Sequence, residues 1–122
     1  MNHFTDIRTI GVPVGDQDRA VAFYTGTLGF ELLMDAPLPE IGGRWIVVAP
    51  PGAPTNLALT PPANGGPADT GVRLVTADAA AAHAHLDQQG VDTDELVTWP
   101  GVPPMFTFRD QDGNTLYVVE EG

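Results

Sequence analysis

The chain has 122 residues and a formal net charge of −11, and all five of its basic residues are arginine. Such an acidic surface repels phosphate backbones and anionic lipids, so we expect neither a nucleic acid nor a membrane as partner. Cysteine is absent, which excludes a disulfide framework, a thiolate zinc site and a cysteine nucleophile.

The first half of the chain predicts a strand, a helix and three further strands. An apolar run predicts a strand over 7–14. Asp16 then begins a helix over 16–28, because its carboxylate can accept from the free backbone donors of the first turn. Gly29 supplies the left-handed residue at which such a helix ends. Further strands are expected over 30–34, 44–49 and 55–60, with a loop over 35–43 that is rich in proline and glycine.

The second half of the chain repeats this order after a linker over 61–69, which is also rich in proline and glycine. A helix is predicted over 77–89, with Thr76 or Asp78 as its cap and Gly90 at its end. The expected strands lie over 71–76, 95–99, 105–109 and 114–120, with a loop over 100–104. Between the last two strands, the Asp112-Gly113 pair supplies the positive φ angles of a tight hairpin turn.

The two halves therefore form an internal repeat of the order βαβββ. A shift of 61 residues superposes them and places Val14 on Val75 and Gly29 on Gly90. Sequence identity between the halves is thin, so the repeated order of elements is the stronger argument. The predicted fold is α+β, with one module over about 5–60 and a second over about 70–122.

Two segments carry a resemblance to a known family. Residues 14–30 read V-G-D-x-x-R-A-x-x-F-Y-x-x-x-L-G-F, and residues 110–114 read D-x-D-G-N. Both resemble anchors of the vicinal oxygen chelate family, which includes glyoxalase I, extradiol dioxygenases and the bleomycin-resistance proteins. The resemblance covers essentially the whole chain. It implies one domain over 1–122, in which two βαβββ modules form a cupped mixed sheet with the helices outside. It also implies a homodimer, as is frequent in the family, and the modules pair either within one chain or across two chains.

The resemblance also implies four strand positions that present His or Glu to a divalent ion in the metal-dependent members. In this chain they hold Thr9, Ala58, Gly71 and Tyr117, with Thr70 in place of Gly71 if the register slips by one residue. A divalent ion needs several nitrogen or oxygen donors that converge at about 2.0–2.6 Å. We therefore expect no metal cofactor; zinc, nickel, iron or manganese would need ligands at displaced positions.

The three histidines do not suggest another metal site. His83 and His85 are two residues apart on the second predicted helix, which separates them by about 200° around its axis. His3 lies in the N-terminal tail. We therefore interpret all three as solvent-facing or half-buried side chains.

The cup lining implied by the resemblance supplies the candidate binding residues, since strand side chains alternate between faces. Arg73 is a cation in an otherwise apolar strand: it either anchors a ligand carboxylate, carbonyl or phosphate, or it is paired internally or turned outward. Tyr117 either donates to a ligand oxygen or packs as an amphipathic side chain. Trp45, Trp99, Met105 and Phe106 form either an aromatic wall or part of the core. The predicted substrate-binding set is Arg73, Tyr117, Thr9, Asn56, Trp45, Trp99 and Met105, with the loops over 35–43 and 99–104 as ligand lids.

Two functions of different classes remain. The first is a metal-free protein that binds a small organic molecule in the cup, as the resemblance to the bleomycin-resistance branch implies. The second is a lyase, isomerase or dioxygenase, either metal-free through Arg73 and Tyr117 or with a divalent metal at displaced ligands, and its catalytic residues are not assigned. The acidic surface either serves solubility or attracts a cationic ligand. The N-terminus lacks the basic and apolar regions of a signal peptide, so we expect a cytoplasmic protein.

Overall fold

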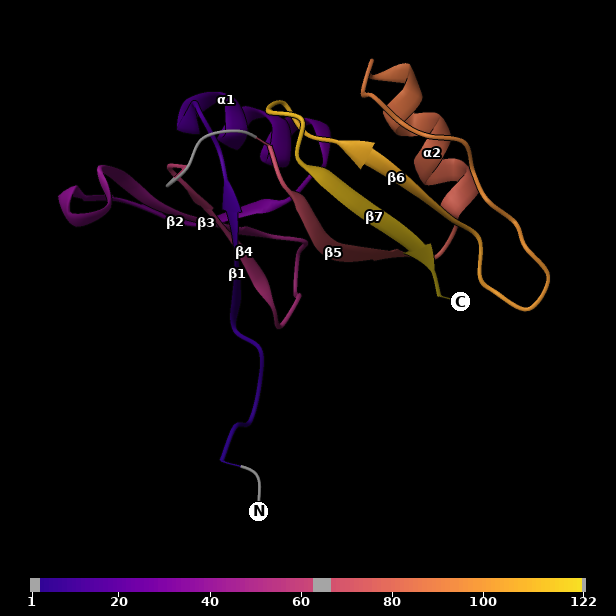
Figure 1. Cartoon of the computed structure of the whole chain (residues 1–122), viewed down its shortest axis with the longest axis horizontal. Coiled ribbons are helices and arrows are strands. Elements are labelled where there is room, and N and C mark those ends of the chain that lie inside the picture. Colours follow the sequence, from indigo (N-terminus) through magenta and orange to yellow (C-terminus); the bar gives the residue numbers. More distant parts are fainter. Residues whose placement is uncertain (1–2, 63–66, 122) are drawn as a thin grey trace. The chain divides into compact units, whose positions relative to one another are not determined.

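The chain forms two compact units, Met1–Gly66 and Pro67–Gly122, which we call the N-terminal unit and the C-terminal unit (Figure 1). The computed structural model describes residues 3–62 and 67–121. Part of the predicted linker, residues 63–66, therefore lies outside the described residues. Within the described ranges, no helix is long and apolar enough to cross a membrane.

The N-terminal unit is built on a four-stranded mixed sheet. The strand order is β1-β4-β3-β2, in which β1 and β4 run parallel and the other pairs run antiparallel. One face of this sheet carries the buried side chains of Val12, Leu57 and Leu59, and α1 packs against β3 and β4. The strands span Thr9–Pro13 (β1), Glu31–Leu38 (β2), Gly43–Ala49 (β3) and Asn56–Thr60 (β4).

The helical segment of this unit begins where the sequence predicts but changes its form halfway. Asp16 caps α1 (Gln17–Val21), and its Oδ1 accepts from the backbone N–H of Arg19 at 3.1 Å. The segment continues as the π-helix η1 (Ala22–Thr27) instead of the predicted α-helix. The Thr25 hydroxyl donates to the Val21 carbonyl at 2.7 Å, a contact that bends helices. Gly29 follows with φ of 77°, as predicted.

The predicted loop over 35–43 is wrong, because most of this segment is a hairpin. Strand β2 continues to Leu38, and only the 3-10 turn η2 (Pro39–Ile41) and Gly42 separate it from β3. Proline is tolerated there because β2 lies at the edge of the sheet. Across the hairpin, Arg44 Nε donates to Asp35 at 2.9 Å, and this bond lowers the pKa of Asp35. The predicted ligand lid over 35–43 is therefore not a loop.

The C-terminal unit is built on a three-stranded sheet in the order β5-β7-β6. Strand β5 runs parallel to β7, and β6 runs antiparallel to β7. Asp78 caps the helix α2 by accepting from the backbone N–H of Ala81 at 3.0 Å, and Gly90 follows it with φ of 79°. Helix α2 packs against β6 and β7. The elements span Asp69–Thr76 (β5), Ala79–Gln88 (α2), Met105–Arg109 (β6) and Thr115–Glu120 (β7).

The predicted strand over 95–99 is wrong, although its segment does lie along β6. It pairs with β6 only through two isolated bridges, Thr93 with Phe108 and Val97 with Met105. Between the two bridges the segment advances four residues, from Thr93 to Val97, while β6 advances only three. The segment therefore has one extra residue, which interrupts the ladder as a β-bulge does. The segment thus lies alongside β6 without forming a regular strand.

The hairpin between β6 and β7 also differs from its prediction. Gly113 has φ of 85°, but no residue other than glycine has a positive φ in the described part of the chain. Asp112 therefore does not adopt the predicted positive φ. Instead, Asp110 Oδ1 accepts from the backbone N–H groups of Asp112 and Asn114 at 2.9 and 3.0 Å. The turn depends on a buried carboxylate more than on a two-residue loop.

The internal repeat is confirmed at the level of topology, except that the second half has the order βαββ because it lacks the predicted strand over 95–99. Each unit pairs its first strand in parallel with its last, β1 with β4 and β5 with β7. Gly29 and Gly90, which the 61-residue shift superposes, share a left-handed conformation with φ of 77° and 79°. The predicted α+β class with two related modules is confirmed.

Candidate functional site

Each unit contains a hollow on the open face of its sheet. The hollow in the C-terminal unit has a volume of about 570 Å³, and we call it the C-terminal pocket. The hollow in the N-terminal unit has a volume of about 470 Å³, and we call it the N-terminal pocket.

The floor of the C-terminal pocket follows from the alternation of side chains along β6 and β7. In β7, Leu116 and Val118 are buried on the helix side, so Tyr117 and Val119 face the opposite side. Met105 lies opposite Val119, and Thr107 lies opposite Tyr117. These four side chains place an apolar surface with two hydroxyl groups on one face of the sheet.

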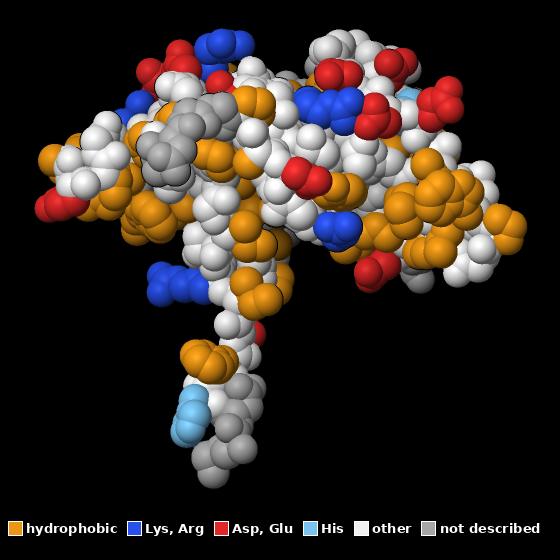
Figure 2. All heavy atoms as spheres, viewed as in Figure 1, with side chains coloured by type: hydrophobic (Ala, Val, Ile, Leu, Met, Phe, Trp, Pro, Cys, Tyr) orange, Lys and Arg blue, Asp and Glu red, His pale blue; other side chains and the backbone are white. Residues whose placement is uncertain are grey.

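The far wall of this pocket comes from the segment over 92–99, which precedes β6 in the chain and lies alongside it. The bridge between Val97 and Met105 holds it through two backbone hydrogen bonds of 2.8 and 3.1 Å. Trp99 extends from this segment and is 65% exposed, so most of its indole is available to a ligand. Hydrophobic side chains gather on the C-terminal unit at the right of Figure 2. The apolar lining residues of the pocket are Val97, Trp99, Met105, Phe106, Val118 and Val119.

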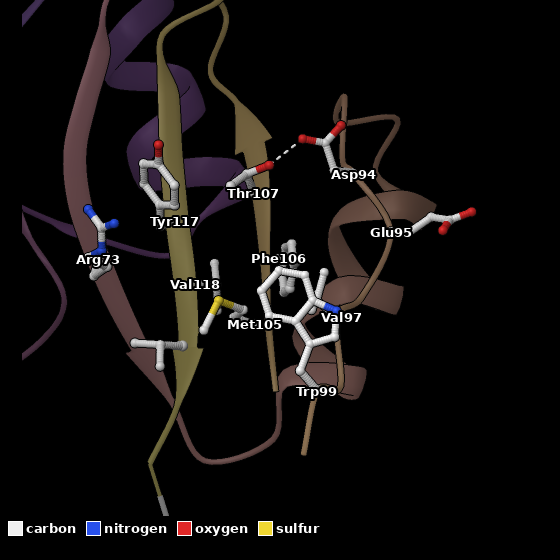
Figure 3. A pocket seen from close by; sticks show the side chains of 11 residues that line it. Arg73, Asp94, Glu95, Val97, Trp99, Met105, Phe106, Thr107, Tyr117 and Val118 are labelled. Atoms are coloured by element: carbon white, nitrogen blue, oxygen red, sulfur yellow. Dashed lines mark hydrogen bonds between the residues drawn. The ribbon is translucent and has the colours of Figure 1, made fainter. Parts of the chain in front are cut away.

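The near wall, on β5, carries the only cation of the lining. Arg73 lies beside Tyr117 in the parallel register, and its guanidinium carbon is 4.1 Å from the centroid of the tyrosine ring. Its Nη1 donates to the Gly71 carbonyl at 2.8 Å. The Tyr117 hydroxyl donates to Asp69 at 2.7 Å, and this hydrogen bond to a carboxylate raises the pKa of Tyr117. Figure 3 shows Arg73 and Tyr117 together, away from Trp99.

An ion-pair cluster fixes the upper end of the far wall. Arg109 holds Asp94 with two hydrogen bonds of 2.7 and 2.8 Å, and the Thr107 hydroxyl donates to the same carboxylate. The hydrogen bond from Arg109 lowers the pKa of Asp94 far below its ordinary value. The His83 ring, from α2, contacts the Asp94 carbonyl through Nε2 at 2.9 Å. Asp94 is therefore an ionised and structurally engaged member of the lining.

The N-terminal pocket is more polar on one side. Thr9 and Asn56 are register partners on β1 and β4, and the Thr9 hydroxyl donates to Asn56 Oδ1 at 2.6 Å. Trp45 from β3 closes the other side of the hollow. Its complete lining is Arg8, Thr9, Leu33, Met34, Trp45, Val47 and Asn56.

The structure distributes the predicted binding residues between these two pockets. Four of them, Arg73, Trp99, Met105 and Tyr117, line the C-terminal pocket. The other three, Thr9, Trp45 and Asn56, line the N-terminal pocket. Trp45 is therefore in a different hollow from the other members of the predicted aromatic wall.

The sequence reasoning missed several lining residues of the C-terminal pocket. Thr107 could have been found, since it alternates with Met105 on a correctly predicted strand. The pairing of the segment over 92–99 with β6 carried no local sequence signal, so its members could not be placed. The missed residues are Asp94, Glu95, Val97, Thr107 and Val118.

The four positions of the implied metal site do not suit a divalent ion. Ala58 and Gly71 have no side-chain donor atom. The hydroxyl of Thr9 donates to Asn56, and that of Tyr117 donates to Asp69. Within the described ranges, no group of three or more histidine, cysteine, aspartate or glutamate side chains is arranged to hold a metal.

The chain is similar over its whole length to proteins of one superfamily. Residues 1–118 match the model of the Glyoxalase/Bleomycin resistance protein/Dioxygenase superfamily. The uncharacterized protein YetH of Bacillus subtilis (strain 168) is 31% identical over 121 residues, which cover 93% of this chain and 97% of YetH.

Two solved structures share both fold and substantial sequence identity with the chain. TnmS3, an antibiotic binding protein from Streptomyces sp. CB03234, is 34% identical with a TM-score of 0.84, and each chain is covered completely. A superfamily member from Sphaerobacter thermophilus DSM 20745 is also 34% identical, with a TM-score of 0.87 and coverage of 97% of this chain and 98% of that one. The chain therefore belongs to the Glyoxalase/Bleomycin resistance protein/Dioxygenase superfamily.

Proposed function

We propose that this protein binds a small, largely apolar organic molecule in the C-terminal pocket and does so without a metal ion. The observation that carries the proposal is the pocket itself. Its volume of about 570 Å³ falls in the range of small-molecule sites, about 300–1,000 Å³. Its apolar floor and exposed indole, with a few polar groups at the edges, are typical of such sites.

The relationship to TnmS3 supports binding as the function. TnmS3 is described as an antibiotic binding protein and aligns with this chain from end to end at 34% identity. A similar scaffold therefore serves small-molecule binding in a relative. The particular ligand of the present protein is a separate question, because a shared fold does not fix the ligand.

The protonation states of the pocket favour binding over proton-transfer chemistry. Asp94 is a weak base, since its hydrogen bond from Arg109 lowers its pKa. Tyr117 is a weak acid, since its hydrogen bond to Asp69 raises its pKa. An efficient general acid or base has a pKa near the working pH, and both shifts lead away from neutrality.

The side chains at the family's ligand positions support the metal-free part of the proposal. Thr9, Ala58, Gly71 and Tyr117 provide no carboxylate, imidazole or thiolate, which are the usual side-chain ligands of divalent ions. Elemental analysis after purification from metal-supplemented medium tests this part directly. Less than one-tenth of an equivalent of zinc, nickel, iron or manganese is expected, whereas one equivalent that a chelator removes would contradict it.

The two tryptophans provide a matched test of the binding pocket. Trp99 lines the C-terminal pocket and Trp45 lines the N-terminal pocket. We expect the neutral dye N-phenyl-1-naphthylamine to bind with enhanced fluorescence, and Trp99→Ala to weaken its binding about tenfold, because the variant removes aromatic contact area. Trp45→Ala is expected to change the affinity less than twofold.

Circular dichroism spectra and thermal unfolding show whether both variants remain folded. Loss of dye binding in Trp45→Ala but not in Trp99→Ala would contradict the choice of pocket. Absence of dye binding to the wild-type protein, together with turnover of a thiol adduct or a catechol, would instead favour an enzyme.

A further inference from the structure

We propose that the ligand of the C-terminal pocket has two chemically distinct ends: a ring system at Trp99 and Met105, and an oxygen acceptor, carbonyl or carboxylate, that Arg73 binds. This inference rests on the proposed function and names the class of ligand that the same pocket would select.

Arg73 has hydrogen-bonding capacity that the protein does not use. A guanidinium carries five N–H donors, and one of the Arg73 nitrogens donates to the Gly71 carbonyl. Across residues 3–62 and 67–121, no ion pair involves Arg73. The neighbouring carboxylate of Asp69 accepts from the Tyr117 hydroxyl instead. Donors of Arg73 therefore remain for a ligand.

Arg73 is an exposed residue, but two contacts restrict the position of its guanidinium before a ligand binds. Its carbon lies 4.1 Å from the centroid of the Tyr117 ring, and Arg73 and Tyr117 are register partners on adjacent strands. Stacking on an aromatic face and the bond to Gly71 both restrict the side chain. Because these contacts already reduce the freedom of the side chain, a hydrogen bond to a ligand costs less entropy to form.

The opposite end of the pocket has a different character. The strand order β5-β7-β6 places Arg73 at one side of the sheet. The segment that carries Val97 and Trp99 lies beside β6 at the other side. Figure 3 shows Met105 between these two ends and the Glu95 side chain turned away from Met105 and Arg73, although Glu95 belongs to the lining. Asp94 lies on the Trp99 side and is paired with Arg109, which also pairs with Asp92. A ligand therefore meets apolar surface at this end and hydrogen-bond donors at the other.

A series of four naphthalenes tests the inference, because they share a ring system and differ in one substituent. These are 2-ethylnaphthalene without an acceptor, 2-acetylnaphthalene with a neutral carbonyl, 2-naphthoate with a carboxylate, and 2-naphthylmethylammonium with a cation. Affinities are measured by quenching of Trp99 fluorescence in a Trp45→Phe background. We expect at least one of the two oxygen acceptors to bind about tenfold more tightly than 2-ethylnaphthalene, since hydrogen bonds to charged groups have this magnitude.

The variant Arg73→Met connects this preference to the proposed donor. In this variant the oxygen acceptors should bind less than twofold more tightly than 2-ethylnaphthalene. The affinity for 2-ethylnaphthalene itself should stay within a factor of about three of the wild-type value. Arg19→Met is the matched control, because Arg19 is exposed on α1 of the N-terminal unit, and it should retain the full preference. Binding of 2-acetylnaphthalene that is independent of salt indicates a neutral carbonyl ligand, whereas tighter binding of 2-naphthoate that weakens with salt indicates an anion.

The outcomes separate the inference from the proposed function. If all four compounds bind equally well, or if 2-naphthylmethylammonium binds best, the inference is wrong and the binding function stands. If the acceptor preference persists in Arg73→Met, another group provides the donor and the inference is again wrong. If none of the four binds, the proposed function fails and the inference with it.

Discussion

Asp94 illustrates how one side chain can link the stability of the C-terminal unit to the shape of its pocket. It belongs to the pocket lining, yet its carboxylate is held by Arg109 and Thr107 on β6. Its backbone N–H also donates to the Thr107 carbonyl at 2.8 Å. The cluster thus secures the otherwise irregular segment that carries Trp99 against the edge of the sheet.

The variant Asp94→Asn should destabilise the protein by about 1 kcal/mol at pH 7, near the upper end for partly exposed ion pairs. The folded pKa of Asp94 is lowered from the ordinary value of 3.8. Its contribution is therefore fully present above the unfolded pKa and is lost as the pH falls below about 4 toward the folded pKa. Thermal unfolding at pH 7 and at pH 2.5 measures this change, and the gap between wild type and variant should narrow at the lower pH.

Asp6→Asn serves as the control for this measurement, because it removes the same charge from an exposed residue before β1. It should change the unfolding temperature at pH 7 by less than about 1 °C, as surface substitutions usually do. An equal effect of the two substitutions, or a gap for Asp94→Asn that does not depend on pH, would contradict the proposed role of the Asp94–Arg109 pair.

At the scale of elements, the helix boundaries could be predicted because their signals are local. An aspartate cap and a terminal glycine act within a few residues of chain, and Asp16, Asp78, Gly29 and Gly90 all have their predicted roles. The form of the helix could not be predicted in the same way. The π-helical half of the first segment involves the contact of Thr25 with the Val21 carbonyl, which an apolar periodicity does not reveal.

Alanine substitutions at two glycines in the N-terminal unit should change the stability of the protein in opposite directions. Gly29 has φ of 77°, whereas Gly26 lies within η1 without a positive φ, and an added Cβ meets no atom within 4 Å at either position. Gly29→Ala should therefore destabilise the protein by about 1 kcal/mol through backbone strain alone. Gly26→Ala should stabilise it by about 0.5–1 kcal/mol, since alanine loses less conformational freedom in a helix. Urea denaturation measures both values, and changes of the same sign would contradict the assigned conformations.

The errors in strand prediction have non-local causes. The proline and glycine content of 35–43 favoured a loop, but the edge position of β2 allows proline to remain in a strand. The segment over 95–99 looks like a strand, but the extra residue between its two bridges prevents a regular ladder. Both outcomes depend on neighbouring strands, which a single segment of sequence does not specify.

At the scale of the whole molecule, the repeat and the family could be predicted, whereas the positions of the pockets could not. The motifs at 14–30 and 110–114 resemble the superfamily that the comparisons show. The candidate residues came from the alternation of strand side chains, and all seven line a hollow. Their division between two hollows depends on strand order and cross-strand register, so the sequence did not reveal which of them lie together.

The three methionines provide the most direct test of the central proposal, that the C-terminal pocket is the ligand site. Met105 lines the C-terminal pocket, Met34 lines the N-terminal pocket, and Met1 begins the chain. Protein labelled with carbon-13 in its methionine methyl groups therefore gives one NMR signal for each pocket and one for the N-terminus. On titration with 2-acetylnaphthalene we expect the Met105 signal to shift and saturate, while the Met34 and Met1 signals stay in place. A saturable shift of Met34 alone, or no shift of any signal at saturating ligand, would contradict the proposal.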